Sequence, residues 1–384
     1  MIGISIALLG IIYFSQIFNR LFKIPVIYSY MTGGFFFSLI SIPVIGRINL
    51  DQLYPFMTLF TAIIFYELGR RIDLRWISAK KYFFISILIM LALMFSIITF
   101  VLSQFGFDSN SARFVGSILI TTSPTFILFT IKEFKAEGYL TENILHIVCL
   151  SNVLGLFLFS ILLDLENYSH VFIFSSETIF QIVKISISAI IGTLMAYIIN
   201  LCSNLFKIEE NSQLIIITLF IVINFLLNMQ FNLYPMMSLL SLGLFTNIKN
   251  HRVNLHKNDL GPISSFSYTM LFVFAGYHLT DIKISSDVFT IATVLLVIKV
   301  TFPLFFLTAI SKMSTLSFKK NALLGTCLLP LSSVAILMIL DINTTTSSLN
   351  EKLNSILLSF ILMSELIGPL LLMLSLKFSG EAKD

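Results

Sequence analysis

Two short polar clusters, each built around a proline, interrupt otherwise apolar stretches of this sequence. The first is Thr121-Thr122-Ser123-Pro124-Thr125 and the second is Leu329-Pro330-Leu331-Ser332-Ser333. A proline inside a helix removes one backbone hydrogen bond and clashes with the carbonyl four residues earlier. Neighbouring hydroxyls can satisfy the groups that it frees. We therefore expect both helices to unwind at these prolines; the alternative is two independent kinks.

Two unwound helices that cross would turn their dipole ends toward one point and form a solute site within the bilayer. The side chains that could bind a solute there are Thr122, Ser123, Thr125, Ser332 and Ser333. A third apolar stretch, LHIVCLSNVLGLFLFSILL, adds Ser151 and Asn152 at its centre. An asparagine oxygen can coordinate Na⁺ or K⁺, but unlike a carboxyl group it cannot release a proton near neutral pH.

Two charged residues also lie deep in apolar stretches, and a charge at such a position is a candidate for function. Lys299 lies about thirteen residues into its stretch, roughly 20 Å from one end at 1.5 Å per residue. It could carry protons, or it could extend to a membrane interface or tether carbonyls of the broken helices. Glu365, midway along the last stretch, could couple protons or hold a structural hydrogen bond. His146 could relay protons or be a bystander.

Composition places these residues in a membrane protein. The chain has 384 residues, of which 57% are hydrophobic and only 11% charged, whereas soluble domains carry about a quarter charged residues. Repeated apolar runs of about 20 residues predict membrane-spanning α-helices. Their continuous apolar character excludes a transmembrane β-barrel, whose strands alternate. The three cysteines lack metal-site spacing, and no cofactor or nucleic-acid motif is present.

Thirteen spans are expected, and basic residues orient them. The spans are 2–21, 24–42, 53–68, 82–104, 113–131, 143–164, 178–200, 212–229, 232–247, 262–281, 286–311, 319–341 and 354–377. With the N-terminus outside, eighteen lysines and arginines fall in cytoplasmic segments and four in external ones. Because cytoplasmic loops are enriched in these residues, we expect an external N-terminus and a cytoplasmic C-terminus.

Thirteen spans divide into six, one and six. A single middle span makes the second six-helix unit run opposite to the first, which is the arrangement of an inverted repeat. We therefore predict a first repeat over 1–177, a linker helix and loop over 178–211, and a second repeat over 212–384. Each proline cluster lies in the fifth span of its repeat.

Several motifs resemble the cation/proton antiporter superfamily, particularly the bacterial sodium/proton and potassium/proton exchangers of the CPA2 type. The motifs are Lys23-Ile24-Pro25-Val26 through Gly33-Gly34, Phe65-Tyr66-Glu67-Leu68-Gly69, Leu242-Gly243-Leu244-Phe245-Thr246-Asn247, Phe272-Val273-Phe274-Ala275-Gly276 and Glu365-Leu366-Ile367-Gly368-Pro369. Their order and spacing along the chain carry the resemblance. It implies that the two broken helices cross in the ion-translocating core, and that the chain pairs as a homodimer in a bacterial plasma membrane.

The resemblance also shows that the ion-binding site departs from the family pattern. In the family, an Asn-Asp or Asp-Asp pair on the sixth span binds the cation and exchanges it for protons. Ser151 and Asn152 fall on that pair, followed by the matching Val153-Leu154-Gly155. Lys299 falls near a family lysine that pairs with the first aspartate. Where relatives carry a charged or polar motif in the twelfth span, this chain has Leu331-Ser332-Ser333.

Three hypotheses for function follow. The first is a secondary transporter that exchanges a monovalent cation for protons by alternating access, with coupling or substrate altered by the missing carboxylates. The second is a carrier for an anion or a neutral solute on the same scaffold, which uses helix N-termini and Lys299. The third is a membrane subunit that keeps the fold without transport. None of the three is an enzyme or needs a cofactor.

Overall fold

The computed structural model describes residues 26–45, 50–167, 176–206, 210–248, 261–278, 285–314, 316–331, 333–345 and 351–382, together with Gly10, Tyr13 and Ile17. All elements in these ranges are helices. In chain order they are α2 (Val26–Ile45), α3 (Leu50–Arg71), α4 (Arg75–Ala79), α5 (Lys81–Gln104), α6 (Ser109–Leu119), α7 (Pro124–Glu133), α8 (Tyr139–Asn167), α9 (Ser176–Phe206), α10 (Glu210–Gln230), α11 (Pro235–Ile248), α12 (Gly261–His278), α13 (Ser286–Ala309), α14 (Phe318–Thr326), α15 (Ser333–Thr345) and α16 (Glu351–Ser379).

The helices agree closely with the expected spans. Each span from 24–42 onward coincides with one helix, or with two helices in the cases of 113–131 and 319–341. These two exceptions are the stretches in which a break was predicted. The span 2–21 falls almost entirely outside the described residues.

Within the described residues, six helical stretches are long and apolar enough to cross a membrane. They are Lys81–Gln104, Ser109–Glu133, Tyr139–Leu163, Ile179–Cys202, Ser286–Ala309 and Lys352–Ser379. Two shorter apolar helices, Ile215–Gln230 and Pro235–Thr246, accompany them. The chain is therefore an all-helical membrane protein, while the total of thirteen spans and the inverted repeat remain predictions.

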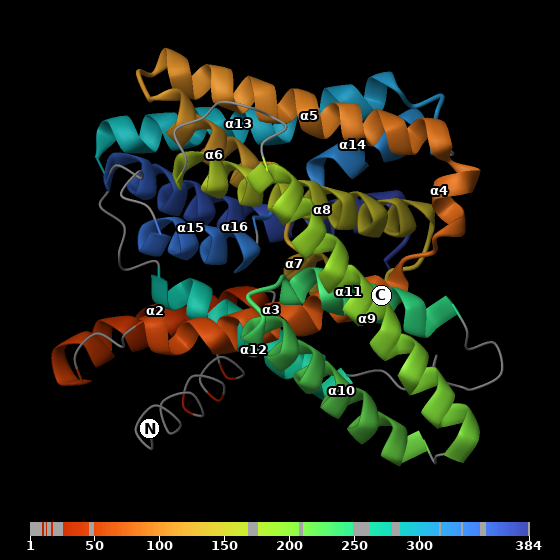
Figure 1. The fold of residues 1–384 in the computed structure, drawn as a ribbon. Coiled ribbons are helices and arrows are strands. Elements are labelled where there is room, and N and C mark those ends of the chain that lie inside the picture. Colours follow the sequence, from red (N-terminus) through yellow and green to blue (C-terminus); the bar gives the residue numbers. More distant parts are fainter. Residues whose placement is uncertain are drawn as a thin grey trace.

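The helices form two bundles that are visible one above the other in Figure 1. The upper bundle contains α5, α6, α8 and α13–α16, and the lower bundle contains α2, α3 and α9–α12. The half-helix α7 packs on α8 and α16 of the upper bundle and on α3 and α12 of the lower one. The first broken helix therefore reaches the boundary between the bundles.

Glycines let helices of the lower bundle approach closely. A Cβ atom on Gly69 of α3 would overlap the backbone oxygen of Leu240 on α11, and one on Gly243 of α11 would overlap the backbone oxygen of Tyr66 on α3. Small residues at facing positions are the usual means of tight helix packing in a membrane, where the hydrophobic effect does not drive helices together. The two glycines thus join α3 and α11 into one unit.

The carboxylate of Glu381, just beyond α16, caps the start of α8. It accepts hydrogen bonds from the backbone N–H groups of Leu140 and Thr141, both at 2.9 Å, and forms an ion pair with Lys320 of α14 at 3.1 Å. Burial alone would raise the pKa of this carboxyl group, but the N–H donors and the lysine hold the pKa below its ordinary value. Glu381 thereby ties α8 to the second broken helix.

We expect Glu381→Gln to lower the free energy of unfolding by about 1–3 kcal/mol at neutral pH, because a charge-assisted cap is lost. The folded pKa is depressed, so this stability is present above the ordinary glutamate value of about 4.3 and is lost as pH falls through the folded pKa. Thermal unfolding in detergent measures the effect. The difference in Tm between wild type and variant should be full at pH 7 and should shrink in acid; a difference independent of pH contradicts the role.

Candidate functional site

Both predicted interruptions are present, and the first has an evident local cause. The helix α6 ends at Leu119, and α7 begins at Pro124, whose missing N–H is harmless at a helix start. Ser123 is the N-cap residue, and its hydroxyl accepts a hydrogen bond from the N–H of Phe126 at 3.3 Å. The four residues 120–123 between the half-helices carry three of the hydroxyl groups of the first cluster, and Thr125 in the first turn of α7 carries the fourth.

The second interruption meets the first. α14 ends at Thr326, and α15 begins at Ser333. The backbone N–H of Ser123 donates to the carbonyl oxygen of Pro330 at 2.8 Å, and the hydroxyl of Thr122 donates to the carbonyl oxygen of Leu328 at 3.2 Å. Backbone groups freed by one break are thus satisfied by the other, as buried backbone groups require. We call this meeting point the crossing.

Asn152 of α8 binds the crossing from the side. Its Nδ2 atom donates to the carbonyl oxygens of Thr122 at 2.6 Å and Val148 at 2.8 Å. Both partners can only accept, which fixes the orientation of the amide. The Oδ1 atom is buried and has no hydrogen-bond partner within the described structure. Ser151, also buried, donates to the carbonyl of Val148 at 3.0 Å.

Lys299 of α13 is fixed to the same strip of backbone. Its side chain is 1% exposed, and its Nζ atom donates to the carbonyl oxygen of Thr121 at 2.7 Å. The ring centroid of Phe360 lies 5.7 Å from Nζ. An ammonium group at the C-terminal end of α6 is favourable because that end of the helix dipole is negative. Among the described residues, no carboxylate forms an ion pair with it.

Glu365 of α16 approaches the crossing from another side. It is 1% exposed, and it lines a cavity of about 10 Å³ together with Ser123 and Thr125. In the described part of the chain, neither Oε2 of Glu365 nor the hydroxyl of Thr125 has a hydrogen-bond partner. A Cβ atom on Gly368, one turn further along α16, would overlap Pro330. This helix therefore packs directly on the second break.

These observations place the two broken helices, α8, α13 and α16 around one buried polar point. A model of the transmembrane region of sodium/hydrogen exchangers matches residues 4–377, nearly the whole chain. The chain belongs to the sodium/hydrogen exchanger family. It is a transporter of the exchanger type and a multi-pass membrane protein, and the family is not one of enzymes.

Among solved structures, this exchanger resembles the sodium proton antiporter MjNhaP1 from Methanocaldococcus jannaschii at pH 8. The TM-score is 0.61, the sequence identity is 16%, and the match covers 99% of this chain and 96% of the other. At this identity the likeness concerns the fold. No curated protein matches the sequence significantly.

The structure of the exchanger brings most of the predicted site residues together. Thr122, Ser123, Asn152 and Lys299 are joined by hydrogen bonds or by adjacent backbone groups at the crossing. Glu365 shares a cavity with Ser123. The residues whose side chains fall outside the description are Ser332, which is not described at all, and Ser333, the first residue of α15. Their predicted contribution to the site is therefore not tested.

The exchanger buries His146 away from the crossing. Its ring stacks on Trp76 with centroids 4.3 Å apart, and its Nδ1 and Nε2 atoms lie 2.8 Å and 3.2 Å from the carbonyl oxygens of Glu142 and Asp73. Trp76 in turn donates to Asn143 at 2.9 Å. Both ring nitrogens thus face backbone carbonyl oxygens, to one of which a neutral imidazole can donate. This local packing agrees with the bystander interpretation.

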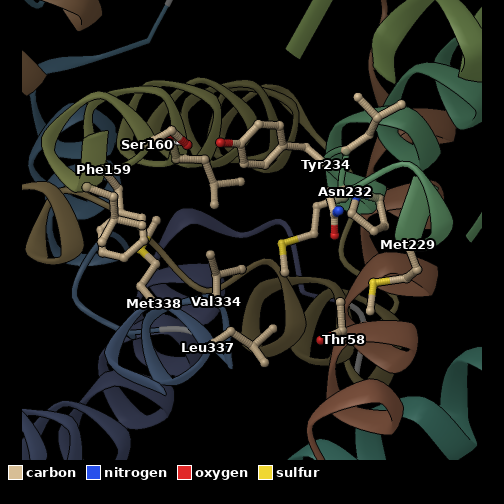
Figure 2. A pocket seen from close by; sticks show the side chains of 14 residues that line it. Thr58, Phe159, Ser160, Met229, Asn232, Tyr234, Val334, Leu337 and Met338 are labelled. Carbon is tan, nitrogen blue, oxygen red and sulfur yellow. Dashed lines mark hydrogen bonds between the residues drawn. The ribbon is translucent and has the colours of Figure 1, made fainter. Parts of the chain in front are cut away.

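The exchanger also contains a pocket of about 450 Å³, larger than the cavity at Glu365, which was not predicted from the sequence. Figure 2 shows its lining, with α15 facing the turn between α10 and α11 and with α8 and α3 nearby. The polar members of the lining are Thr58, Ser160, Asn232 and Tyr234. Leu156, one helical turn beyond Asn152, also lines it, so the pocket ends about one turn from the crossing. The sequence feature that could have indicated this pocket is the presence of isolated hydroxyl residues, such as Thr58 and Ser160, in apolar spans.

Proposed function

We propose that this exchanger moves a monovalent cation, Na⁺ or K⁺, in one direction and protons in the other, by alternating access at the crossing. The observation that carries the proposal is the meeting of two broken helices with Asn152, Lys299 and Glu365, all buried, in a chain of the sodium/hydrogen exchanger family. Unwound backbone within a membrane protein is tolerated where it is buried or lines a cavity, and transporters place their sites there.

The two bundles offer a physical basis for alternating access. The 450 Å³ pocket lies between α8 and α15 of the upper bundle and α3, α10 and α11 of the lower bundle. A relative displacement of the bundles would close this pocket and open the opposite side. The positive-inside pattern supports an opening toward the cell exterior, because the residues of the pocket lie in the halves of the spans that are assigned to the outside.

The branch of the family, the repeats, the homodimer and the individual ligands are proposed from the sequence. The order of the motifs supports the CPA2 branch, two inverted repeats (1–177 and 212–384) around a linker (178–211), and a homodimer in a bacterial plasma membrane. Ser151 and Asn152 replace the usual aspartate pair, so the ligands for the cation are expected among Ser151, Asn152, Thr122, Ser123, Thr125, Ser332 and Ser333. Protons are expected to be coupled through Glu365 or Lys299.

A proton-flux assay tests the proposal. Proteoliposomes with an internal pH dye and an acidic interior should become alkaline inside when Na⁺ or K⁺ is added outside, because an entering cation expels protons. Protein-free liposomes and addition of choline are the matched controls. If the monodisperse protein gives no response to Na⁺, K⁺ or Li⁺, cation/proton exchange is rejected.

One observation favours a second candidate, a carrier of an anion or a neutral solute. Lys299 is a buried basic group bonded to the carbonyl of Thr121 at the crossing, and a positive charge there would attract an anion. Thermal stabilisation by a panel of inorganic anions and small organic solutes would separate the two functions. An exchanger should respond to Na⁺ or K⁺ and not to this panel.

A further inference from the structure

We propose that the exchanged cation is bound, without its water, by Glu365 and Thr125 in the small cavity beside the crossing, and that Glu365 is the group that exchanges it for a proton. This inference rests on the proposed function. The carboxylate that exchanges the proton is then Glu365 on α16, and not a residue at position 152. The ligand of the cavity is one dehydrated monovalent cation.

The surroundings of Asn152 are unsuited to a cation because donors already occupy the carbonyl oxygens there. The carbonyls of Thr122 and Val148 accept from the amide of Asn152, and the carbonyl of Thr121 accepts from Lys299. A cation at these oxygens would have to displace an amide group and lie near an ammonium group. Within the described structure, the acceptor at this place that has no hydrogen-bond partner is the Oδ1 atom of Asn152 itself.

The cavity at Glu365 has the opposite character. Its lining contains the carboxylate of Glu365 and the hydroxyls of Ser123 and Thr125, and the remaining members are apolar residues of α7 and α12. Oε2 of Glu365 and Oγ1 of Thr125 are buried acceptors that no described donor satisfies. Oxygen ligands of this kind suit alkali cations as well as hard divalent ones. A volume of about 10 Å³ holds one water molecule at most, or one bare ion.

A carboxylate at this depth needs a compensating charge. An isolated ionised carboxylate in an apolar interior is so costly that it pairs, binds a metal or takes up a proton. The described neighbours offer no cation, so the group has two low-energy forms: the carboxylic acid, and the carboxylate with a bound cation. Exchange between them is balanced, since the acid releases H⁺ from its O–H bond as the cation binds. The site is neutral in both forms, and one charge moves each way.

The cavity lies at the boundary between the two bundles. Glu365 and Thr125 belong to α16 and α7, whereas Phe272 and Ala275 on the opposite wall belong to α12 of the lower bundle. A displacement of one bundle against the other would therefore open this cavity. The site lies where alternating access requires it, at the boundary between the moving parts.

No second titratable group lines the cavity within the described chain. On the helices packed against α16 and the cavity, the other described acidic, lysine and histidine side chains are engaged elsewhere or lie toward the helix ends, and Cys149, Tyr277 and Cys327 do not line the cavity. Lys299 binds Thr121, His146 stacks on Trp76, Tyr268 donates to Glu67, Lys320 pairs with Glu381, Tyr28 donates to Leu366, and Lys132, Glu133 and Asp287 lie in the last or first turns of α7 and α13. Glu365 is thus the group that a proton must reach.

Proton flux and cation binding in Glu365→Gln test the inference. The glutamine has the same shape but cannot exchange a proton, so cation-dependent flux in proteoliposomes should fall to the protein-free background. The stabilisation of purified protein by Na⁺ or K⁺, larger at pH 8 than at pH 6 in wild type, should disappear. Ser364→Ala is the matched control, because Ser364 is the buried neighbour on the same helix and bonds to its own helix at Ile361.

A second ligand variant and a conservative one complete the design. Thr125→Val removes a ligand oxygen with little change of shape and should weaken the apparent cation affinity about tenfold, the lower end of the cost of losing a partner in a metal site. Glu365→Asp keeps the carboxylate and should retain exchange at lower affinity. Should Glu365→Gln fail to fold, these two variants decide: wild-type affinity in Thr125→Val overturns the site.

The outcomes separate the inference from the function on which it rests. If wild type gives no cation-dependent flux but is stabilised by cations through Glu365, the binding site stands and the exchange function fails. If wild type exchanges and a folded Glu365→Gln variant exchanges equally well, the function stands and the assignment of Glu365 is overturned.

Discussion

Replacing Asn152 by aspartate is expected to raise cation-dependent proton flux well above the wild-type level. The amide nitrogen of Asn152 now lies between the carbonyl oxygens of Thr122 and Val148. A carboxylate cannot donate to these oxygens, so it must either take a proton or share a cation with them. Both carbonyls would then serve as ligands, and the new group would exchange the cation for a proton as carboxylates do in membrane carriers.

Lys299 makes a charge at this position tolerable. Its ammonium group is bonded to Thr121, the residue next to Thr122, so an aspartate at position 152 would have a counter-charge close by. Opposite charges within a few ångströms favour the ionised form of a carboxyl group. Cation and lysine would compete for that carboxylate, which couples binding to a local rearrangement at the crossing.

The control for this gain is Asn152→Ala, which removes both donations without adding a charge. It should lower the Tm, because each lost hydrogen bond to a buried carbonyl costs about 1–3 kcal/mol, and it should give no gain in flux. Both variants are measured with the internal pH dye at equal protein density. A monodisperse Asn152→Asp protein with wild-type flux would show that the cation path does not pass the amide.

Replacing Lys299 by methionine is expected to reduce exchange by about ten- to a hundredfold. Methionine has similar length and keeps the packing on Phe360, but Thr121 loses its donor. A hydrogen bond from a charged group is worth about 1.5–3 kcal/mol, and every 1.4 kcal/mol is about tenfold in an equilibrium constant. The loss acts on the geometry of the crossing, because the lysine holds the carbonyl of Thr121 in the unwound stretch after α6.

The proton-to-cation ratio distinguishes an anchoring lysine from a proton carrier. Lys299→Gln retains a donor, so an anchoring role predicts slower exchange at an unchanged ratio, whereas a proton-carrying role predicts a lower ratio. We expect the ratio to stay the same, since Glu365 is the group proposed to exchange the proton. Lys184→Met, a lysine of α9 that lies 4.7 Å from the ring centroid of Phe180, serves as control and should leave both quantities unchanged.

The sequence predicted the breaks in the helices well because their causes are local. Pro124 and Ser123 determine where α7 begins through a missing N–H and an N-cap hydroxyl, and both can be recognised from neighbouring residues. The spans could be predicted for the same reason, since the hydropathy of about 20 consecutive residues is enough to recognise a membrane-spanning helix. These features needed no knowledge of how the helices pack.

The details of the site depended on packing and could not be predicted. The two donations of Asn152 require Thr122, thirty residues earlier, to present its carbonyl. The cavity at Glu365 requires α16, α7 and α12 to meet, and the cap on α8 is supplied by Glu381 from 240 residues away. Tertiary contacts of this kind decide whether a buried carboxylate is structural or available, and the sequence left both interpretations open for Glu365.

Proton-driven accumulation of radioactive sodium or rubidium is the most direct measurement of exchange by this protein. Proteoliposomes with an acidic interior are placed in alkaline medium that contains the tracer, and the membrane potential is clamped. We expect the tracer to accumulate inside against its gradient, at a rate that does not change with the clamped potential, since one charge crosses each way. Tracer that merely equilibrates, or that accumulates equally without a pH gradient, would contradict cation/proton exchange.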